Sequence, residues 1–179
     1  DLVRSRGLGD VYKRQEYMAV LEVVKAGHPI LKEVAEPVEH VNKKMRALIE
    51  DMADTMYKTE GVGLAAPQVN VSKRIIVVDD HAGSGLIALI NPEIIHGEGS
   101  QIGLEGCLSV PGYFGDVERF EKVTVTGIDP HNKKVMIKAE GFLARIFQHE
   151  IDHLEGHLFI EKATNLRRIA DHPEEKEIV

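Results

Sequence analysis

Residues 148–156 read QHEIDHLEG, and they form the most informative stretch of the chain. Apolar residues occupy most sides of the surrounding segment when it is drawn as a helix: Phe142, Ile146, Phe147, Ile151 and Leu154. Gly156 then provides a common signal for the end of a helix. The pattern predicts a largely buried helix from Phe142 to Glu155.

Two histidines and a glutamate lie within this predicted helix. His149 and His153 are four positions apart, so they lie about 40° apart around the helix axis and both can reach one metal ion. Glu150 lies about 100° round from His149, beside the metal, where a carboxylate can transfer protons. Burying these polar groups together requires a compensating partner, which a metal provides. The alternative is a surface helix carrying ion pairs, and the apolar flanks argue against it.

The sequence offers several candidates for a third ligand. In one protease pattern a third histidine follows the glycine by three positions, where this chain has Phe159. His157 stands two residues too early, and we interpret it as structural or exposed. Glu174 and Glu175 lie in a polar tail that is too short to pack on a core. The remaining candidate is Cys107, the only cysteine of the chain.

Cys107 lies in the segment 105–112, which reads EGCLSVPG. A lone cysteine is most often a small buried hydrophobic residue. Here Gly106 permits a close approach of the backbone, and Pro111 and Gly112 are expected to break the chain after the cysteine. These features predict a sharp, functional loop.

A third stretch, residues 61–68, reads GVGLAAPQ. Its two glycines and two alanines leave the backbone bare, which suits a peptide substrate that hydrogen-bonds to main-chain groups. The alternative is a helix end followed by a tight crossing of the chain. The Gly-x-Gly pattern lacks the further glycine and the preceding strand of a dinucleotide site.

Periodicity predicts the remaining elements. Asn42–Tyr57 carries the apolar stripe of an amphipathic helix, with Asn42 as its N-cap. Short strands are expected at Arg74–Asp79 and Ile87–Asn91, and a hairpin over Lys122–Glu140. Strands and helices are segregated along the chain, so we expect an α+β fold with antiparallel sheets packed around the central metal-binding helix.

Composition excludes several classes of protein. The chain has 179 residues, of which 43% are hydrophobic and 28% charged, and its net charge of −7 argues against a general nucleic-acid binder and against an anionic membrane surface as partner. We expect no membrane partner and no specific nucleic acid. No apolar run approaches the roughly 20 residues that span a bilayer. A single cysteine fits a reducing compartment. These features predict a single-domain, cytoplasmic protein.

The two ends of the chain differ from its centre. Residues 1–17 carry basic side chains with little apolar periodicity, and the sequence becomes rich in apolar residues from Met18 onward. We expect residues 1–17 to be a non-native or disordered extension, with a genuine basic arm as the alternative. The folded domain is expected over residues 18–165, and the polar, acidic tail 166–179 is expected to fray.

These three motifs together resemble the peptide deformylase family, which removes the N-formyl group from nascent polypeptides. GVGLAAPQ at 61–68, EGCLS at 105–109 and QHEIDHLEG at 148–156 match the three family motifs in order and spacing. The resemblance runs from about Met18 to about Asn165 and is closest to the bacterial-type, insertion-free form. The acidic tail departs from members whose basic C-terminal helix docks on the ribosome.

The resemblance implies a role for each motif residue. Cys107, His149 and His153 would bind one metal ion and leave a fourth position for water. Metal-bound hydroxide would attack the formyl carbon, with Glu150 as general base and then general acid. The side-chain amide of Gln68 would stabilise the oxyanion. The backbone N–H of Leu108 would be the second donor. The alternative for Gln68 is a solvated loop residue.

Substrate binding follows from the same interpretation. The peptide is expected to add as a strand against main-chain groups near Val62, Gly63 and Gly106. Selectivity for methionine requires an apolar pocket, for which Val62, Phe142 and Ile146 are candidates. The alternative for these side chains is packing in the core.

Two further polar residues are expected to support the site. Glu105 is expected to hold the cysteine loop by hydrogen bonding. Gln148 is expected to support the site from behind its ligands.

The sequence constrains the identity of the metal and of the partners less than it constrains the site residues. A thiolate with two imidazoles suits Zn, Fe(II), Co or Ni, and the resemblance implies Fe(II) as the native ion. It also implies N-formylmethionyl peptides of nascent chains as substrates, with a weak or transient contact with the ribosome. The rival enzyme is a zinc endopeptidase, which shares the metal and the glutamate. The rival from another class is a metal-sensing or structural module, which needs a fourth soft ligand near the motifs.

Overall fold

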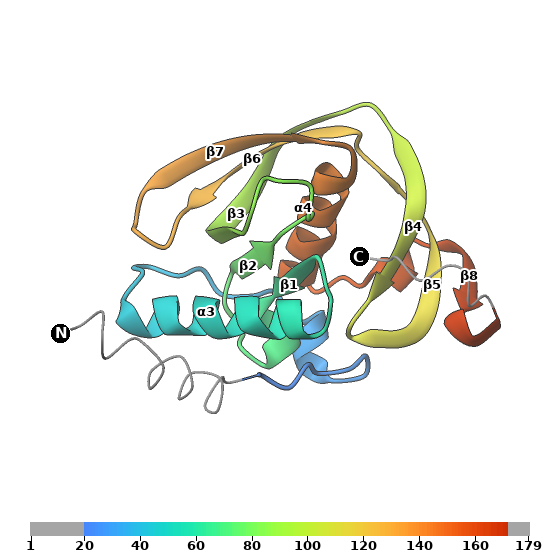
Figure 1. The fold of residues 1–179 in the computed structure, drawn as a ribbon, viewed down its shortest axis with the longest axis horizontal. Coiled ribbons are helices and arrows are strands. Elements are labelled where there is room, and N and C mark those ends of the chain that lie inside the picture. The colour runs from blue at the N-terminus through green and yellow to red at the C-terminus, as the bar shows by residue number, and fades with distance from the viewer. Residues whose placement is uncertain (1–19, 172–179) are drawn as a thin grey trace.

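The computed structural model describes residues 20–171, which form two α-helices and two antiparallel sheets (Figure 1). The larger sheet has the strand order β1-β2-β3-β6-β7, with β1 Gly63–Ala65, β2 Ile75–Val78, β3 Ile87–Glu98, β6 Lys122–Ile128 and β7 Lys134–Glu140. The smaller sheet has the order β4-β5-β8, with β4 Gln101–Cys107, β5 Val110–Arg119 and β8 Thr164–Arg168. The helices are α3 Lys43–Lys58 and α4 Gly141–Leu154, and short 3-10 turns occur at η1 Pro29–Lys32, η2 Ala66–Val69, η3 Phe159–Glu161 and η4 Ile169–Asp171.

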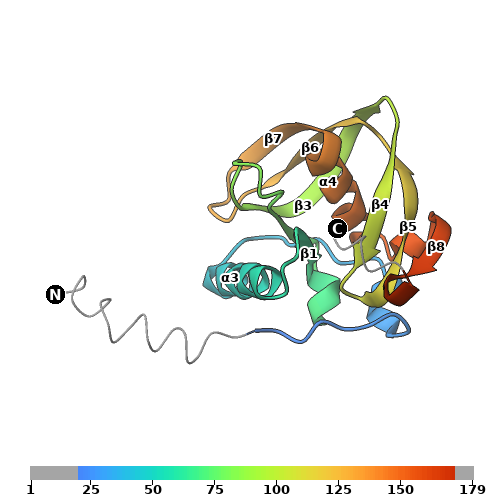
Figure 2. The ribbon, with the colours of Figure 1, turned by 45° about the vertical axis from the view of Figure 1, so that its right-hand side comes forward.

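Helix α4 lies between the two sheets, and both views show it there (Figures 1 and 2). Its apolar side chains enter a buried cluster with the large sheet, in which Ile146, Phe147 and Leu154 are fully buried. Ile76 of β2 and Val125 of β6 belong to the same cluster. The predicted α+β fold around a central helix is therefore confirmed, and the helix boundaries differ from the prediction by one residue at each end.

Helix α3 covers the β1–β2 side of the large sheet. Asn42 caps its first turn, because the Oδ1 atom of Asn42 accepts a hydrogen bond from the backbone N–H of Met45 at 2.9 Å. Met52 and Met56 are fully buried in a second apolar cluster with Val77 of β2. Both the helix and its N-cap agree with the prediction.

The predicted strands are present with different bounds: β2 is shorter than expected, at Ile75–Val78 instead of Arg74–Asp79, and β3 is longer. The hairpin is confirmed, with β6 and β7 paired from Lys122↔Glu140 to Ile128↔Lys134. Strand β3 continues past Asn91 to Glu98. Asn91 has a positive φ of 51°, and a β-bulge-like irregularity between Ile90 and Glu93 accommodates it within the strand. The Asn91 side chain also accepts a hydrogen bond from the N–H of Val38 at 2.8 Å.

The C-terminal part of the described chain belongs to the smaller sheet. Strand β8 pairs with β5 through Phe114↔Arg167 and Asp116↔Thr164, and the Arg167 guanidinium lies 4.7 Å from the centroid of the Phe114 ring. The segment 166–171, expected to fray, is thus strand and 3-10 turn, because its backbone completes the edge of β5. The predicted extension 1–17 and the rest of the tail, 172–179, lie outside the described residues. Neither helix of the described chain has the length and apolar character needed to cross a membrane.

Candidate metal centre

Three side chains with metal-binding atoms meet where the end of β4 approaches α4. One ligand atom each from Cys107, His149 and His153 lies within 4.8 Å of the other two. The Cys107 Sγ and His153 Nε2 atoms are 3.4 Å apart. All three residues are buried. The helix brings the two histidines together because they are one turn apart, and the β4–β5 hairpin brings the cysteine to them.

The chemistry of these donors fits a metal ion. A thiol and two imidazoles are ligands that soft and borderline divalent metals prefer, and three protein ligands leave an open position, as catalytic sites require. Among the described residues this is the only cluster of histidine, cysteine and carboxylate groups found able to hold a metal. The structure therefore brings together the three candidate ligands that the sequence analysis named.

The hairpin that carries Cys107 differs from the predicted loop. A two-residue turn separates β4 from β5, and a register irregularity pairs Cys107 with Val110. Pro111 and Gly112 lie inside β5 rather than breaking the chain. Gly112 adopts φ +86°, a conformation that its missing Cβ allows, and the strand continues through it.

Glu105 is the hydrogen-bond partner of the first histidine. Its Oε1 atom lies 2.8 Å from the Nδ1 atom of His149, and the carboxylate is fully buried. Burial raises the pKa of Glu105, but hydrogen bonds from Arg119 and His149 outweigh it and hold the pKa well below its usual range. Glu105 is therefore a carboxylate that orients the ring of His149 and leaves its Nε2 atom facing the cluster.

The two histidines differ in their electrostatic surroundings. Burial, the charge of His149 and the charge of Arg119 hold the pKa of His153 well below its usual value. Burial also disfavours the charged form of His149, but its hydrogen bonds with Cys107 and Glu105 raise its pKa well above the usual value. Metal binding requires neutral imidazoles.

Glu150 lies beside the ligands as a buried carboxylate. Its side chain is almost fully buried, and its Oε1 atom has no hydrogen-bond partner among the described residues. Burial raises the pKa of Glu150 to about 7, against the opposing charge of His149. A Cβ atom at Gly63 would overlap the carboxylate, so the glycine of β1 makes room for it. A carboxyl group with this pKa can both accept and donate a proton near neutral pH.

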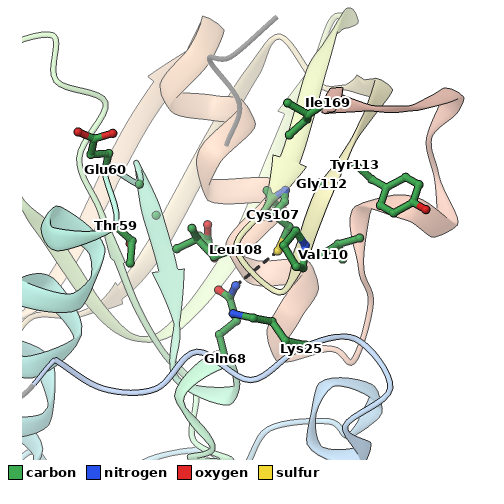
Figure 3. A pocket seen from close by; sticks show the side chains of 15 residues that line it. Lys25, Thr59, Glu60, Gln68, Cys107, Leu108, Val110, Gly112, Tyr113 and Ile169 are labelled. Carbon is green, nitrogen blue, oxygen red and sulfur yellow. Dashed lines mark hydrogen bonds between the residues drawn. The ribbon is translucent and has the colours of Figure 1, made fainter. Parts of the chain in front are cut away.

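Gln68 is buried beside the cysteine and is not a solvated loop residue. Its Nε2 atom donates to Cys107 Sγ at 3.4 Å, drawn as a dashed line in Figure 3, and lies 3.2 Å from Ser109 Oγ. Its Oε1 atom accepts from the N–H of Ala65 at 2.9 Å, which fixes the amide orientation. The amide N–H group therefore faces the metal centre.

A cavity of about 390 Å³ opens onto this centre. Gly61, Gly63, Gln68, Leu108 and Glu150 line it, together with residues that the sequence analysis did not single out for binding: Lys25, Thr59, Glu60, Val110, Tyr113 and Ile169. Figure 3 shows Glu60 and Thr59 on one side of the cavity and Tyr113 and Ile169 on another. Ile169 follows β8. Sequence periodicity does not reveal that β8 pairs with β5, and so it could not place Ile169 at the cavity.

Four predicted substrate-binding residues lie outside this lining. Ile146 is fully buried in the core, and Phe142 is 45% exposed at the start of α4. Val62 packs against the core, and its carbonyl accepts the N–H of Asp79 at 2.8 Å. Gly106 pairs with Phe114 of β5. Their roles in binding remain predictions.

Gln148, expected to support the site, hydrogen-bonds to the backbone of Phe120, the residue that follows β5. Its Oε1 atom accepts the N–H of Phe120 at 2.9 Å, and its Nε2 atom donates to the carbonyl of the same residue at 3.0 Å. His157, interpreted as structural or exposed, is exposed and lies 3.3 Å from Glu161.

Comparison with known proteins shows which family the chain belongs to. The sequence pattern of the family described as polypeptide deformylase matches residues 20–169 of this chain. The chain belongs to the polypeptide deformylase family. A peptide deformylase of Symbiobacterium thermophilum is 58% identical over 161 residues, which cover 89% of this chain and 74% of that relative.

Solved deformylase structures share the fold. The crystal structure of a peptide deformylase from Legionella pneumophila is 43% identical, with a TM-score of 0.79 over 82% of this chain and 88% of that chain. A class I type b peptide deformylase from Acinetobacter baumannii, crystallised with Met-Ala-Ser bound, is 41% identical, with a TM-score of 0.77 over 81% and 99% of the two chains. The family is one of metalloenzymes that remove the N-formyl group from nascent peptides, and this chain is an enzyme of that family.

Proposed function

We propose that Cys107, His149 and His153 hold one divalent metal ion and that Glu150 transfers the proton during hydrolysis of the N-formyl group. The observation that carries this proposal is the cluster of three ligand atoms within 4.8 Å beside a buried carboxylate whose Oε1 has no partner among the described residues. When bound, the metal supplies Lewis-acid chemistry that makes water a nucleophile near neutral pH.

Glu150 performs the proton transfer. It takes a proton from water as the water oxygen bonds to the formyl carbon, and it gives that proton to the amine nitrogen as the carbon–nitrogen bond breaks. The products are formate and a peptide with a free amino terminus. The pKa of about 7 that burial gives Glu150 supports both halves of this transfer. Gly63 supports it further by leaving room for the carboxylate.

Gln68 and the backbone N–H of Leu108 are proposed to stabilise the negative charge that develops on the formyl oxygen. The support for Gln68 is its amide orientation, which the bond from Ala65 N–H determines. Leu108 follows Cys107 directly and lines the cavity. Donors that are already oriented cost little reorganisation during the reaction.

The substrate is proposed to bind as an added strand. β1 is an edge strand of the large sheet and carries Gly63, which lines the cavity. An edge strand has backbone groups that can pair with an extended peptide whatever its side chains are. The binding of Met-Ala-Ser to the related Acinetobacter baumannii enzyme supports a peptide that begins with methionine.

The native metal is proposed to be Fe(II), with Zn, Ni and Co as other occupants of the same ligands. We place the reaction in the cytoplasm, where nascent chains are made and a single thiol stays reduced. The contact with the ribosome is proposed to be weak or transient. The net charge of −7 supports this, because ribosomal RNA repels a negatively charged protein.

The decisive experiment measures formate release from an N-formyl-Met tripeptide, using anaerobic protein loaded with Fe(II). We expect rapid release, no release from the N-acetyl tripeptide, and no cleavage of internal peptide bonds. Glu150→Gln is the matched control, because it keeps the size of the side chain and removes its basicity; it should bind metal and lose turnover. Absence of formate release despite full metal occupancy would overturn the proposal, and cleavage of internal bonds would favour an endopeptidase.

A further inference from the structure

Arg145 is a buried charge on the helix that carries the two histidines. It lies one turn before His149 and is 2% exposed. Its Nη1 atom donates to Glu105 Oε2 at 2.6 Å and to the carbonyl of Val117 at 2.9 Å, with a longer contact to the carbonyl of Gly103 at 3.4 Å. Its Nη2 atom donates to Gln101 Oε1 at 3.2 Å. The guanidinium therefore joins α4 to both long strands of the smaller sheet.

The partner of Arg145 is the carboxylate that orients a metal ligand. Arg119 donates to both oxygens of Glu105, at 2.9 Å and 2.8 Å. Arg145 adds a third bond to the carboxylate, the second on Oε2, while His149 lies on Oε1. Two buried arginines thus determine the position and plane of one carboxylate, and the remaining contact of that carboxylate is with the histidine.

The backbone around Arg145 is shaped to receive it. A Cβ atom at Gly103 would lie 3.0 Å from Arg145 Nη2 and 3.1 Å from its Nε. The guanidinium therefore lies against bare backbone of β4, where a larger residue would crowd it. Burying a guanidinium is costly unless it is paired and hydrogen-bonded, and here its Nη1 and Nη2 groups both have acceptors.

We propose that Arg145 is a positioning residue for the metal centre: by fixing Glu105, it fixes the ring orientation of His149 and so the affinity for the metal. The inference rests on the proposed metal ligands. Partners behind metal-binding histidines typically change metal affinity about 10- to 100-fold when they are removed. Arg145 acts one step further back, through the carboxylate: its guanidinium bonds to Glu105, and it is not among the residues that line the cavity.

A double-mutant cycle on the full chain tests this pathway. Arg145→Met, Glu105→Gln and the double variant are titrated with Co(II) as apo-proteins, and the dissociation constant and the visible absorption spectrum of bound Co(II) are recorded. We expect Arg145→Met to weaken Co(II) binding about 10-fold or more and to change the spectrum. In the Glu105→Gln background the same substitution should add little, because the carboxylate that transmits its effect is absent. Arg145→Lys should restore part of the affinity, since it keeps one donor to Glu105.

Gly103→Ala provides a gentler perturbation in case the charge variants fold poorly. It keeps every charged group and crowds only the guanidinium, so we expect a smaller loss of Co(II) affinity in the same direction. Arg74→Met is the matched control. Arg74 donates to the carbonyl of Leu154 at 3.1 Å and pairs with Glu155, so it supports the other end of α4 without contacting Glu105. It should lower stability and leave the Co(II) dissociation constant unchanged.

The outcomes separate this inference from the proposed function. Additive effects of Arg145→Met and Glu105→Gln on the logarithm of the dissociation constant would overturn the inference alone. An equal effect of Arg74→Met would also overturn it, because general loosening of α4 would then account for the loss. A wild-type protein that binds no Co(II) at all would overturn the metal centre first, and the inference with it.

Discussion

At the scale of single residues, a missing side chain matters as much as a present one. Gly63 of β1 leaves the space that the Glu150 carboxylate occupies, and a Cβ atom there would overlap it. We predict that Gly63→Ala displaces the carboxylate and lowers kcat for formate release at least 10-fold, a loss of about 1.4 kcal/mol or more in transition-state stabilisation. Metal content should stay at the wild-type level, because the three ligands are untouched.

Gly61→Ala is the control for this prediction. A Cβ atom at Gly61 would lie 3.5 Å from Leu108 Cδ1, an ordinary van der Waals contact. The Gly61→Ala variant should therefore keep most of the wild-type kcat, although Gly61 also lines the cavity. Equal losses in the two variants would show that any added methyl group in this wall disturbs the reaction, and that Gly63 has no special relation to Glu150.

At the scale of elements, the first turn of α3 depends on one side chain. The bond from the Met45 N–H to Asn42 Oδ1 satisfies a backbone group that the helix leaves free. We predict that Asn42→Ala lowers the free energy of unfolding by about 0.5–2 kcal/mol. Urea unfolding should show a lower midpoint with an unchanged slope, and Asn42→Ser should recover most of the loss. An unchanged midpoint in Asn42→Ala would contradict the assigned cap.

The end of α3 is joined to the end of β2 by a titratable pair. The Tyr57 hydroxyl donates to Asp79 Oδ2 at 2.6 Å. Burial, followed by this bond and the charge of Asp79, raises the pKa of Tyr57 from 10.0 to about 12. The bond from Tyr57 also lowers the pKa of Asp79, against the opposing effect of burial. The pair therefore links the helix to the sheet most strongly while the tyrosine is neutral and the aspartate is ionised.

These shifts predict the pH dependence of stability. Between pH 10 and about 12 the unfolded chain releases the Tyr57 proton and the folded chain keeps it, so this contribution falls as the pH rises through that window. The Asp79 contribution is present above its ordinary pKa of 3.8 and falls as the pH drops below it. In Asp79→Asn, the Tyr57 titration, followed by tyrosinate absorbance and assigned by difference from Tyr57→Phe, should move back toward 10. A titration that stays near 12 would contradict the role of Asp79.

Sequence periodicity identified those parts of the fold whose signals are local. Helix α4, the Asn42 cap and the β6–β7 hairpin each depend on neighbouring residues, and each is confirmed. Strand β8 has no such signal, because it forms by backbone pairing with β5, about 50 residues earlier in the chain. Pro111 and Gly112 mark a turn in most sequences, but here they lie in the register irregularity at the start of β5, between the Cys107↔Val110 and Gly106↔Phe114 pairs.

The cluster of candidate metal ligands could be predicted, and the groups that support it only in part. Histidines one turn apart and a single cysteine are informative by type and spacing alone. The partner of Glu105 could not be read in advance, because Arg119 and Arg145 come from different elements. One signal was present for Arg145: it is the only charged residue in the run from Phe142 to Phe147, which is buried in α4 from Ala144 onward.

At the scale of the whole molecule, the metal centre joins two separately packed regions. Cys107 belongs to an apolar cluster with Val117 and Phe159 on the side of the smaller sheet, whereas α4 packs its apolar face on the large sheet. A metal held by Cys107 and the two histidines would cross-link these regions in the folded state only. Because the clusters are apolar and already buried, the apo-protein should stay folded, unlike small domains that depend on zinc.

We therefore predict that metal removal lowers the melting temperature without unfolding the protein. Free metal at 100 times its dissociation constant should add about 2.7 kcal/mol to the free energy of unfolding. Thermal unfolding followed by circular dichroism, with and without a chelator, measures this difference. Cys107→Ser should melt near the apo wild type and respond much less to added metal, because the oxygen of serine is a poorer ligand than the thiolate for a soft metal. A chelated wild-type protein with no cooperative transition would show instead that the metal, and not the apolar clusters, holds the two sheets together.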